Sequence, residues 1–285
     1  DPILNPGLGS NGWAIGRDKS TGGKGMLLSN THFPGQGERR WHESHLTIPG
    51  ELNVYGASLM GVPVINIGFN EHVAWTHTVS NTPRFIVHEL ALEEGNPTTY
   101  AFDGGTEQMR AHHYIIDVKG DDGAIERVPR TLFTSRYGPV VNMPVVGWTP
   151  LNAFSYRDVN NNNTGLSQTW LKMNTSTDLE SFKAAHRDYQ GIPWVHTLYA
   201  DDQGNAYYTD SAATPNLSPA AEDAYEAFLD DSVFAGLFAG YGVFVVDGAD
   251  LVNTWVDDPR AVLPGAIPFD DNPQLLRGDF VSNAN

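Results

Sequence analysis

The sequence predicts an α+β fold in which β-sheet is in the majority. Apolar and β-branched runs broken by Gly, Asn and Asp pairs dominate the first 150 residues, a pattern typical of strands joined by tight turns. Helical signals are confined to two later segments. Because most of the expected strands are joined by short turns, we expect a largely antiparallel sheet.

Four hairpins are expected where two strand-like runs flank a short polar turn. The paired runs are residues 13–15 with 26–28, 62–69 with 73–79, 114–118 with 124–128, and 195–200 with 206–210. The first hairpin, turning at residues 20–23, would bring Ser10 near His32.

Two helices are expected in the second half of the chain. The run from Thr177 to Glu180 is typical of a capping box, and apolar residues follow it at helical spacing. Ser218 and Pro219 predict the start of a second helix over residues 220–229, with proline at the first helical position.

Composition limits the classes of function. The chain has 34 acidic and 17 basic residues, a net charge of −17, which argues against nucleic-acid and membrane-surface partners. It contains no cysteine, which excludes disulfides, thiolate metal sites and a cysteine nucleophile. No apolar run reaches the roughly 18 residues of a membrane span, and a neutral small-molecule substrate is the better fit.

The junction between Gly9 and Ser10 is the main candidate for chemistry. If the chain were cleaved there, Ser10 would carry a hydroxyl nucleophile and an amine on one residue. An α-amine has a reference pKa of about 7.7–8.0, so near neutral pH it can accept the serine proton without a separate triad. The alternative is that residues 9–12 form an ordinary polar turn.

Metal-like patterns are better explained by structural roles. His42, Glu43 and His45 lack the four-residue helical spacing of a zinc protease motif. His72 and His77, five residues apart along a strand-like segment, would fall on opposite faces. We therefore expect no metal and no cofactor.

Ordered sequence blocks resemble the start of the large chain of the penicillin acylase family, most closely its aculeacin A acylase and acyl-homoserine lactone acylase branch. The blocks are residues 9–15 (GSNGWAI), 27–34 (LLSNTHFP), 56–63 (GASLMGVP), 67–70 (IGFN), 74–79 (AWTHTV), 136–140 (RYGPV), 192–195 (IPWV) and 282–285 (SNAN). Together they extend in order over nearly the whole chain from Gly9 onward.

The resemblance implies an N-terminal nucleophile hydrolase with an αββα sandwich. Residues 1–9 would then end a spacer and residues 10–285 would form the first, incomplete part of the hydrolase domain. Ser10 would be the nucleophile after self-cleavage, and His32 would contact the nucleophile region. The backbone N–H of Val79 and the side-chain amide of Asn285 would stabilise the oxyanion, with Asn283 as the alternative to Asn285.

The resemblance also implies hydrolysis of the amide between an acyl chain and an amine, in a substrate of the acyl-homoserine lactone, acylated lipopeptide or penicillin type. It implies a separate small chain and the rest of the large chain as partners, and a periplasmic or secreted location. Apolar walls suit an acyl tail, and the candidate wall residues are Phe33, Leu59, Val79 and Trp194. Because residues 80–84 carry no carboxylate, we expect no calcium there. The competing hypothesis is a non-catalytic or unprocessed fragment that binds acyl groups without turnover.

Overall fold

The computed structural model describes residues 9–142, 147–230 and 244–284. Contacts divide the chain into two compact units, each built from separated segments. Unit 1 comprises residues 1–84, 162–216 and 257–285, and unit 2 comprises residues 85–161 and 217–256. The residues expected to act in chemistry all belong to unit 1.

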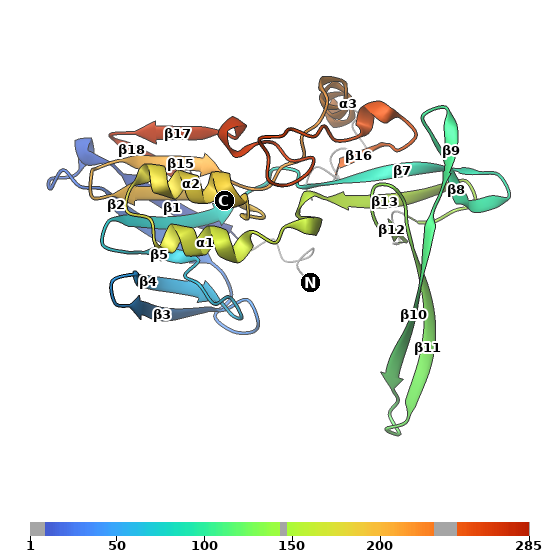
Figure 1. Cartoon of the computed structure of the whole chain (residues 1–285), viewed down its shortest axis with the longest axis horizontal. Coiled ribbons are helices and arrows are strands. Elements are labelled where there is room, and N and C mark those ends of the chain that lie inside the picture. The colour runs from blue at the N-terminus through green and yellow to red at the C-terminus, as the bar shows by residue number, and fades with distance from the viewer. Residues whose placement is uncertain (1–8, 143–146, 231–243, 285) are drawn as a thin grey trace. The chain divides into compact units, whose positions relative to one another are not determined.

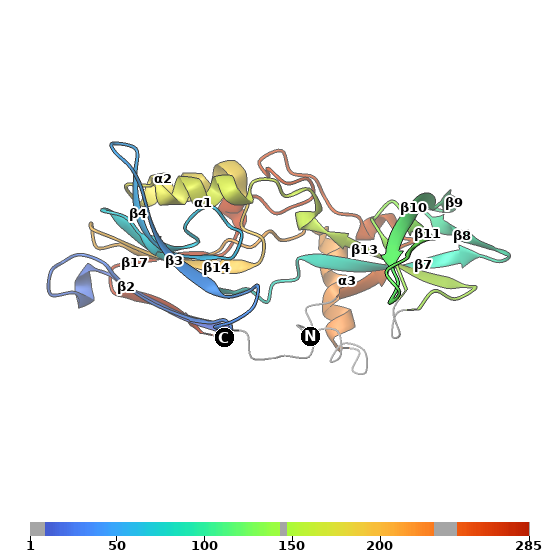
Figure 2. The ribbon, with the colours of Figure 1, turned by 90° about the horizontal axis from the view of Figure 1, so that it is seen from below.

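Unit 1 contains a layer of helices and two stacked sheets (Figures 1 and 2). The larger sheet has the order β17-β15-β14-β6-β5-β4-β3. Its strands are β3 (Trp41–Ile48), β4 (Leu52–Leu59), β5 (Ile67–Phe69), β6 (Val73–Val79), β14 (Val195–Asp201), β15 (Ala206–Asp210) and β17 (Gln274–Arg277). The smaller sheet, β18-β1-β2, consists of β1 (Gly9–Ile15), β2 (Met26–His32) and β18 (Phe280–Ala284). Every strand pair in these two sheets is antiparallel.

Helices α1 (Leu166–Asn174) and α2 (Leu179–Tyr189) cover one face of the seven-stranded sheet. Their apolar faces pack on the sheet around Trp75, Phe182 and Tyr199, all fully buried. The small sheet packs on the opposite face, where Ala14 and Leu198 belong to a second cluster. Among the described residues, unit 1 thus forms the α, β and β layers of the expected sandwich.

A buried asparagine ties α1 to the large sheet. The side chain of Asn174 accepts from the Ile65 N–H at 3.0 Å and donates to the Ile65 carbonyl at 2.8 Å. Asn174 is 1% exposed, so both backbone groups of Ile65 depend on this one side chain. The contact fixes the segment that precedes β5.

Unit 2 is also built mainly from strands. A six-stranded sheet has the order β12-β13-β7-β8-β9, with β16 pairing to β7 in parallel. Its strands are β7 (Phe85–Glu93), β8 (Asn96–Phe102), β9 (Gly105–Gln108), β12 (Val140–Val141), β13 (Asn152–Asp158) and β16 (Phe244–Asp247). The long ribbon of β10 (Arg110–Lys119) and β11 (Ile125–Thr134) and helix α3 (Pro219–Asp230) complete it (Figure 1).

The four expected hairpins are confirmed by the strand pairings. The predicted capping box is wrong in register: Asp178, not Thr177, is the N-cap of α2, and its partner is Ser181, not Glu180. Both Thr177 and Asp178 can cap a helix. In the structure the Asp178 carboxylate accepts a hydrogen bond from the N–H of Ser181 at 2.7 Å. Helix α3 begins as expected, because the Ser218 hydroxyl accepts from the N–H of Ala221.

No helix among the described residues is both long and apolar enough to cross a bilayer.

Replacing Asn174 by Ala should destabilise the protein by about 2–4 kcal/mol, because two buried backbone groups of Ile65 would lose their partners. Denaturant unfolding measures this change. Gln168→Ala, on the exposed face of the same helix, is the control and should change stability by less than about 0.5 kcal/mol. Equal effects of the two substitutions would contradict the role assigned to Asn174.

Stability should fall as the pH is lowered, because burial lowers the pKa of His186 from 6.5 to about 4. The unfolded chain binds a proton near pH 6.5 while the folded chain does not, so the histidine's contribution is complete above pH 6.5 and is lost toward pH 4. Between pH 6.5 and 5.5 this single group should remove about 1 kcal/mol. Urea unfolding of the protein and of His186→Met at both pH values tests it: the variant should lose less stability by that amount, and identical losses would refute the assignment.

Candidate active site

Ser10 lies on the central strand of the small sheet, with its side chain facing the large sheet. It is opposite Thr31 of β2, and β1 also pairs with β18. Ser10, Gly12 and Ala14 alternate onto the buried face, and Ser10 is 2% exposed. Its hydroxyl donates to the Gly9 carbonyl oxygen at 2.5 Å. The strand therefore places the hydroxyl beside the carbonyl of the Gly9–Ser10 peptide bond.

A cavity of about 130 Å³ lies next to Ser10 within unit 1. Aromatic and aliphatic side chains make up most of its wall, as in most sites for small molecules. The lining residues are Ser10, Thr31, Phe33, Trp41, Leu59, Val62, Asn66, Ile67, His77, Thr78, Val79, Leu166, Trp170, Pro193, Trp194 and Val195. All four of the wall residues expected from the sequence, Phe33, Leu59, Val79 and Trp194, are among them.

Val79 ends strand β6 at this cavity. It is opposite Val195 of β14, and the next residue, Ser80, donates its N–H to the Trp194 carbonyl at 3.1 Å. The backbone of residues 79 and 80 is thus held by an adjacent strand and the residue before it. This placement brings Val79 and Ser10, which are far apart in sequence, to one cavity.

His32 is not brought to the Ser10 hydroxyl. It is opposite Gly9 in the β1–β2 register, so its side chain lies on the face of the sheet away from Ser10. There it is exposed, and its Nε2 lies 3.1 Å from Asn11 Nδ2 and 3.5 Å from Asn30 Nδ2. The geometry places His32 beside the Gly9 end of the Gly9–Ser10 bond, on the outer face.

Of the two asparagines that are candidates for the oxyanion donor, the structure describes Asn283. Asn285 lies outside the described residues. Asn283 is opposite Gly12 in strand β18, and its Oδ1 accepts from the Thr78 hydroxyl at 2.6 Å. This bond joins the two sheets one residue before Val79, and Asn283 is not among the residues that line the cavity.

The cavity also contains a buried histidine that the sequence pattern did not mark as part of the site. The Trp170 indole N–H donates to His77 Nε2 at 2.9 Å, while His77 Nδ1 lies 3.1 Å from the Thr197 hydroxyl and 3.2 Å from the His196 carbonyl. Burial lowers the pKa of His77 to about 3. The ring is therefore neutral, with Nδ1 as its donor, and it fixes the Trp170 ring in the cavity wall.

The segment after Val79 is held by a carboxylate from β15. The hydroxyls of Ser80 and Thr82 donate to Asp210 Oδ2 at 3.2 and 2.6 Å, and His196 Nδ1 lies 3.3 Å from Oδ1. Burial acts to raise the pKa of Asp210, but the hydrogen bonds from His196 and Thr82 outweigh it and the pKa is lowered. Within the described ranges, no three His, Asp or Glu side chains are grouped in a way that could hold a metal ion.

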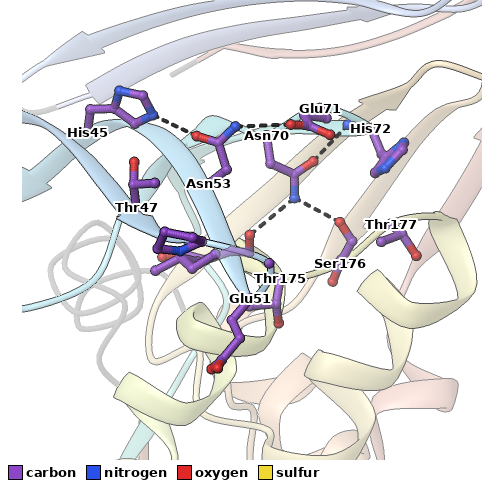
Figure 3. A pocket seen from close by; sticks show the side chains of 14 residues that line it. His45, Thr47, Glu51, Asn53, Asn70, Glu71, His72, Thr175, Ser176 and Thr177 are labelled. Atoms are coloured by element: carbon purple, nitrogen blue, oxygen red, sulfur yellow. Dashed lines mark hydrogen bonds between the residues drawn. The ribbon is translucent and has the colours of Figure 1, made fainter.

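A second, larger hollow of about 540 Å³ lies between the β3–β4 turn and the α1–α2 connection (Figure 3). Its wall is polar: Asn53 accepts from His45 at 2.8 Å and donates to Glu71 at 3.0 Å. Asn70 donates to the carbonyls of Asn174 and Ser176. Ser10, His32 and Val79 do not line this hollow.

Comparisons with known proteins agree with this fold. The family model described as penicillin amidase matches residues 2–285. The acyl-homoserine lactone acylase PvdQ of Pseudomonas syringae pv. syringae is 41% identical over 97% of this chain and 34% of its own length. The aculeacin-A acylase of Actinoplanes utahensis is 38% identical over 98% of this chain and 34% of its own length. The chain thus spans about a third of the curated relatives it matches.

The fold comparison gives the same result. The thermostable penicillin G acylase from Alcaligenes faecalis superposes with a TM-score of 0.73 at 18% identity, covering 96% of this chain and 43% of that one. This match confirms the predicted fold class, an N-terminal nucleophile hydrolase architecture built mostly from antiparallel sheets. With a family model matched over nearly its whole length, the chain belongs to the penicillin amidase family.

Proposed function

We propose that the protein hydrolyses the amide bond between an acyl chain and an amine, with Ser10 as the nucleophile. One observation carries the proposal: the buried Ser10 hydroxyl and the end of strand β6 share a single, mostly apolar cavity. An acyl tail bound there would place its carbonyl carbon near a nucleophile that is already in position. The names of the relatives, acylases for acyl-homoserine lactones and aculeacin A, support this substrate class.

The chain as written is the uncleaved form in this proposal. The Ser10 hydroxyl, which already donates a hydrogen bond to the Gly9 carbonyl oxygen, attacks the Gly9 carbonyl carbon. An ester forms between Gly9 and Ser10 Oγ as the peptide C–N bond breaks, and the hydroxyl proton passes to the freed nitrogen. Water then hydrolyses the resulting ester, which releases the Gly9 carboxylate and leaves Ser10 with a free α-amine. His32, beside Gly9 on the outer face, would help to hold this end of β1 during cleavage.

The freed amine acts as the base in substrate hydrolysis. With a pKa of about 7.7–8.0, it takes the proton from the hydroxyl as Oγ attacks the acyl carbonyl, and then gives that proton to the leaving amine. An acyl ester remains on Ser10. Water attacks this ester by the same route, releasing the fatty acid and restoring the hydroxyl.

The Val79 N–H and the Asn285 side-chain amide would stabilise the oxyanion of each tetrahedral intermediate. Val79 is supported by its place at the cavity, and Asn285 rests on the family resemblance. Each such donor is typically worth about 2.7–4 kcal/mol of the barrier. The proposed partners are the remainder of the large chain and a separate small chain. The proposed location is periplasmic or secreted.

Ser10→Ala should abolish both cleavage after Gly9 and turnover of N-acyl substrates, because it removes the attacking oxygen. Mass spectrometry of the complete protein measures the cleavage, and release of homoserine lactone from its N-acyl derivatives measures turnover. Ser167→Ala, an exposed serine of α1, should leave both unchanged. Full activity of a preparation that keeps residues 1–9 would contradict the proposal and favour an unprocessed chain.

Leu59→Phe should shift the preference toward shorter acyl tails, because the added ring volume fills part of a 130 Å³ cavity. Each lost methylene contact changes discrimination by about 1–3 kcal/mol, so the ratio of kcat/KM for long over short tails should fall about 10-fold or more. A homologous series of N-acyl homoserine lactones measures the ratio. An unchanged ratio would remove Leu59 from the acyl site.

A further inference from the structure

Strand β6 directs the backbone N–H of Val79 away from the neighbouring strand β14. Val79 is opposite Val195, and the N–H of the next residue, Ser80, donates to the Trp194 carbonyl. In an antiparallel ladder, opposite residues alternate between pairs that exchange hydrogen bonds and pairs that do not. The Ser80 bond makes Val79 and Val195 a pair of the second kind, so the direction of the Val79 N–H depends on how Ser80 is held.

Beyond β6 the chain is held by side-chain hydrogen bonds to one carboxylate. Residues 80–84 are not in a strand. The hydroxyls of Ser80 and Thr82 donate to Asp210 Oδ2 at 3.2 and 2.6 Å, and the Thr82 N–H donates to the Ser80 hydroxyl oxygen at 3.2 Å. These three bonds link Ser80, Thr82 and Asp210 to one another, which fixes the chain directly after Val79.

Asp210 is itself held firmly. It ends strand β15 opposite His196, whose Nδ1 lies 3.3 Å from Asp210 Oδ1. The Ala212 N–H donates to the same oxygen at 3.3 Å, and the Asp210 N–H donates to the Pro273 carbonyl at 3.0 Å. The residue is 8% exposed, and its pKa is lowered despite burial. The group that holds Ser80 is therefore an ionised, nearly immobile acceptor.

A second buried carboxylate in the same hairpin shows what is unusual about Asp210. Asp201, at the other end of β14, is 3% exposed and accepts from Tyr199, Gln203 and Asn205. Those partners belong to the β14–β15 hairpin, so Asp201 serves the local turn. The hydroxyl partners of Asp210 come instead from a distant segment, the one that follows Val79.

We propose that Asp210 is a positioning residue for amide hydrolysis, which fixes Ser80 and thereby aims the Val79 N–H at the oxyanion. This inference rests on the proposed function, in which that N–H stabilises the oxyanion. Asp210 does not line the cavity at Ser10, so it acts through Ser80 and not on the substrate. A donor contributes only while it is aligned with the oxyanion, and a misplacement of about 1 Å can cost about 100-fold in rate.

Asp210→Asn tests the proposal in the complete protein, because it keeps the side-chain shape but leaves a single acceptor oxygen. The kcat for hydrolysis of an N-acyl homoserine lactone should fall about 10- to 100-fold. KM should change less than about 2-fold, since oxyanion stabilisation acts in the transition state. Asp201→Asn is the matched control and should leave kcat unchanged. Equal losses of kcat in the two variants would indicate general damage and overturn the proposal.

Thr82→Val removes the shorter of the two hydroxyl bonds and leaves Asp210 intact. It should lower kcat in the same way, and it supplies the kinetic result if Asp210→Asn is not cleaved after Gly9. Because both changes act on one contact, the double variant should lose no more than Asp210→Asn alone. Losses that add up in full would contradict a shared role.

Hydrogen exchange of the Ser80 amide measures the positioning without any turnover. In Asp210→Asn this amide should exchange about 5- to 10-fold faster than in wild type, whereas Asp201→Asn should leave its rate unchanged. An unchanged rate in Asp210→Asn would overturn the proposal, in the cleaved or the uncleaved chain alike.

The failures of the two proposals can be told apart. If wild type hydrolyses the substrate but Asp210→Asn keeps its kcat, or changes only KM, the Asp210 proposal is overturned and the acylase proposal stands. If wild type hydrolyses no N-acyl substrate, the acylase proposal fails. The exchange rate of the Ser80 amide then decides whether Asp210 fixes the end of β6.

Discussion

The close approach of strand β1 to the large sheet is the constraint on which the rest of the site depends. A Cβ atom at Gly12 would lie 3.0 Å from the Thr76 methyl carbon and 3.1 Å from a Leu198 methyl carbon, tighter than an ordinary van der Waals contact. A side chain at this position would push the two sheets apart. Ser10 is two residues earlier on the same face, so this contact sets how deeply its hydroxyl is buried.

Charge is kept out of the cavity by hydrogen bonding and burial together. His77 is the cavity residue that could become positive, but its desolvated ring stays neutral and accepts from Trp170. A neutral, mostly apolar wall strengthens the attraction between an oxyanion and fixed N–H donors.

Local patterns accounted for much of the fold. The hairpin around residues 120–123 and the start of α3 at Ser218 follow from turn and capping residues that act over a few positions. The β3–β4 hairpin was not anticipated, because His42, Glu43 and His45 alternate with few apolar residues. Helix α1 was also missed: its N-cap, Gly165, makes no side-chain capping bond, so no local signal marks its start.

The sequence predicted which residues lie near Ser10 better than it predicted how their side chains are oriented. The wall residues came from a family resemblance, and the structure gathers them at Ser10. The side chain of His32 lies on the other face because successive side chains of a strand point to opposite faces of the sheet. A predicted hairpin does not show which residue of β2 lies opposite Ser10. Asn66 gave no sequence signal, since an asparagine before a strand usually faces water.

The pairing of β1 with β18 has a consequence for the order of assembly. Gly12 and Asn283 are neighbours in the sheet although most of the chain lies between them, so a contact of long sequence separation must form before β1 is flanked on both sides. A ribosome-bound chain that has not yet produced β18 leaves one edge of the Ser10 strand open. The timing of synthesis therefore separates the appearance of Ser10 from the completion of the sheet that buries it.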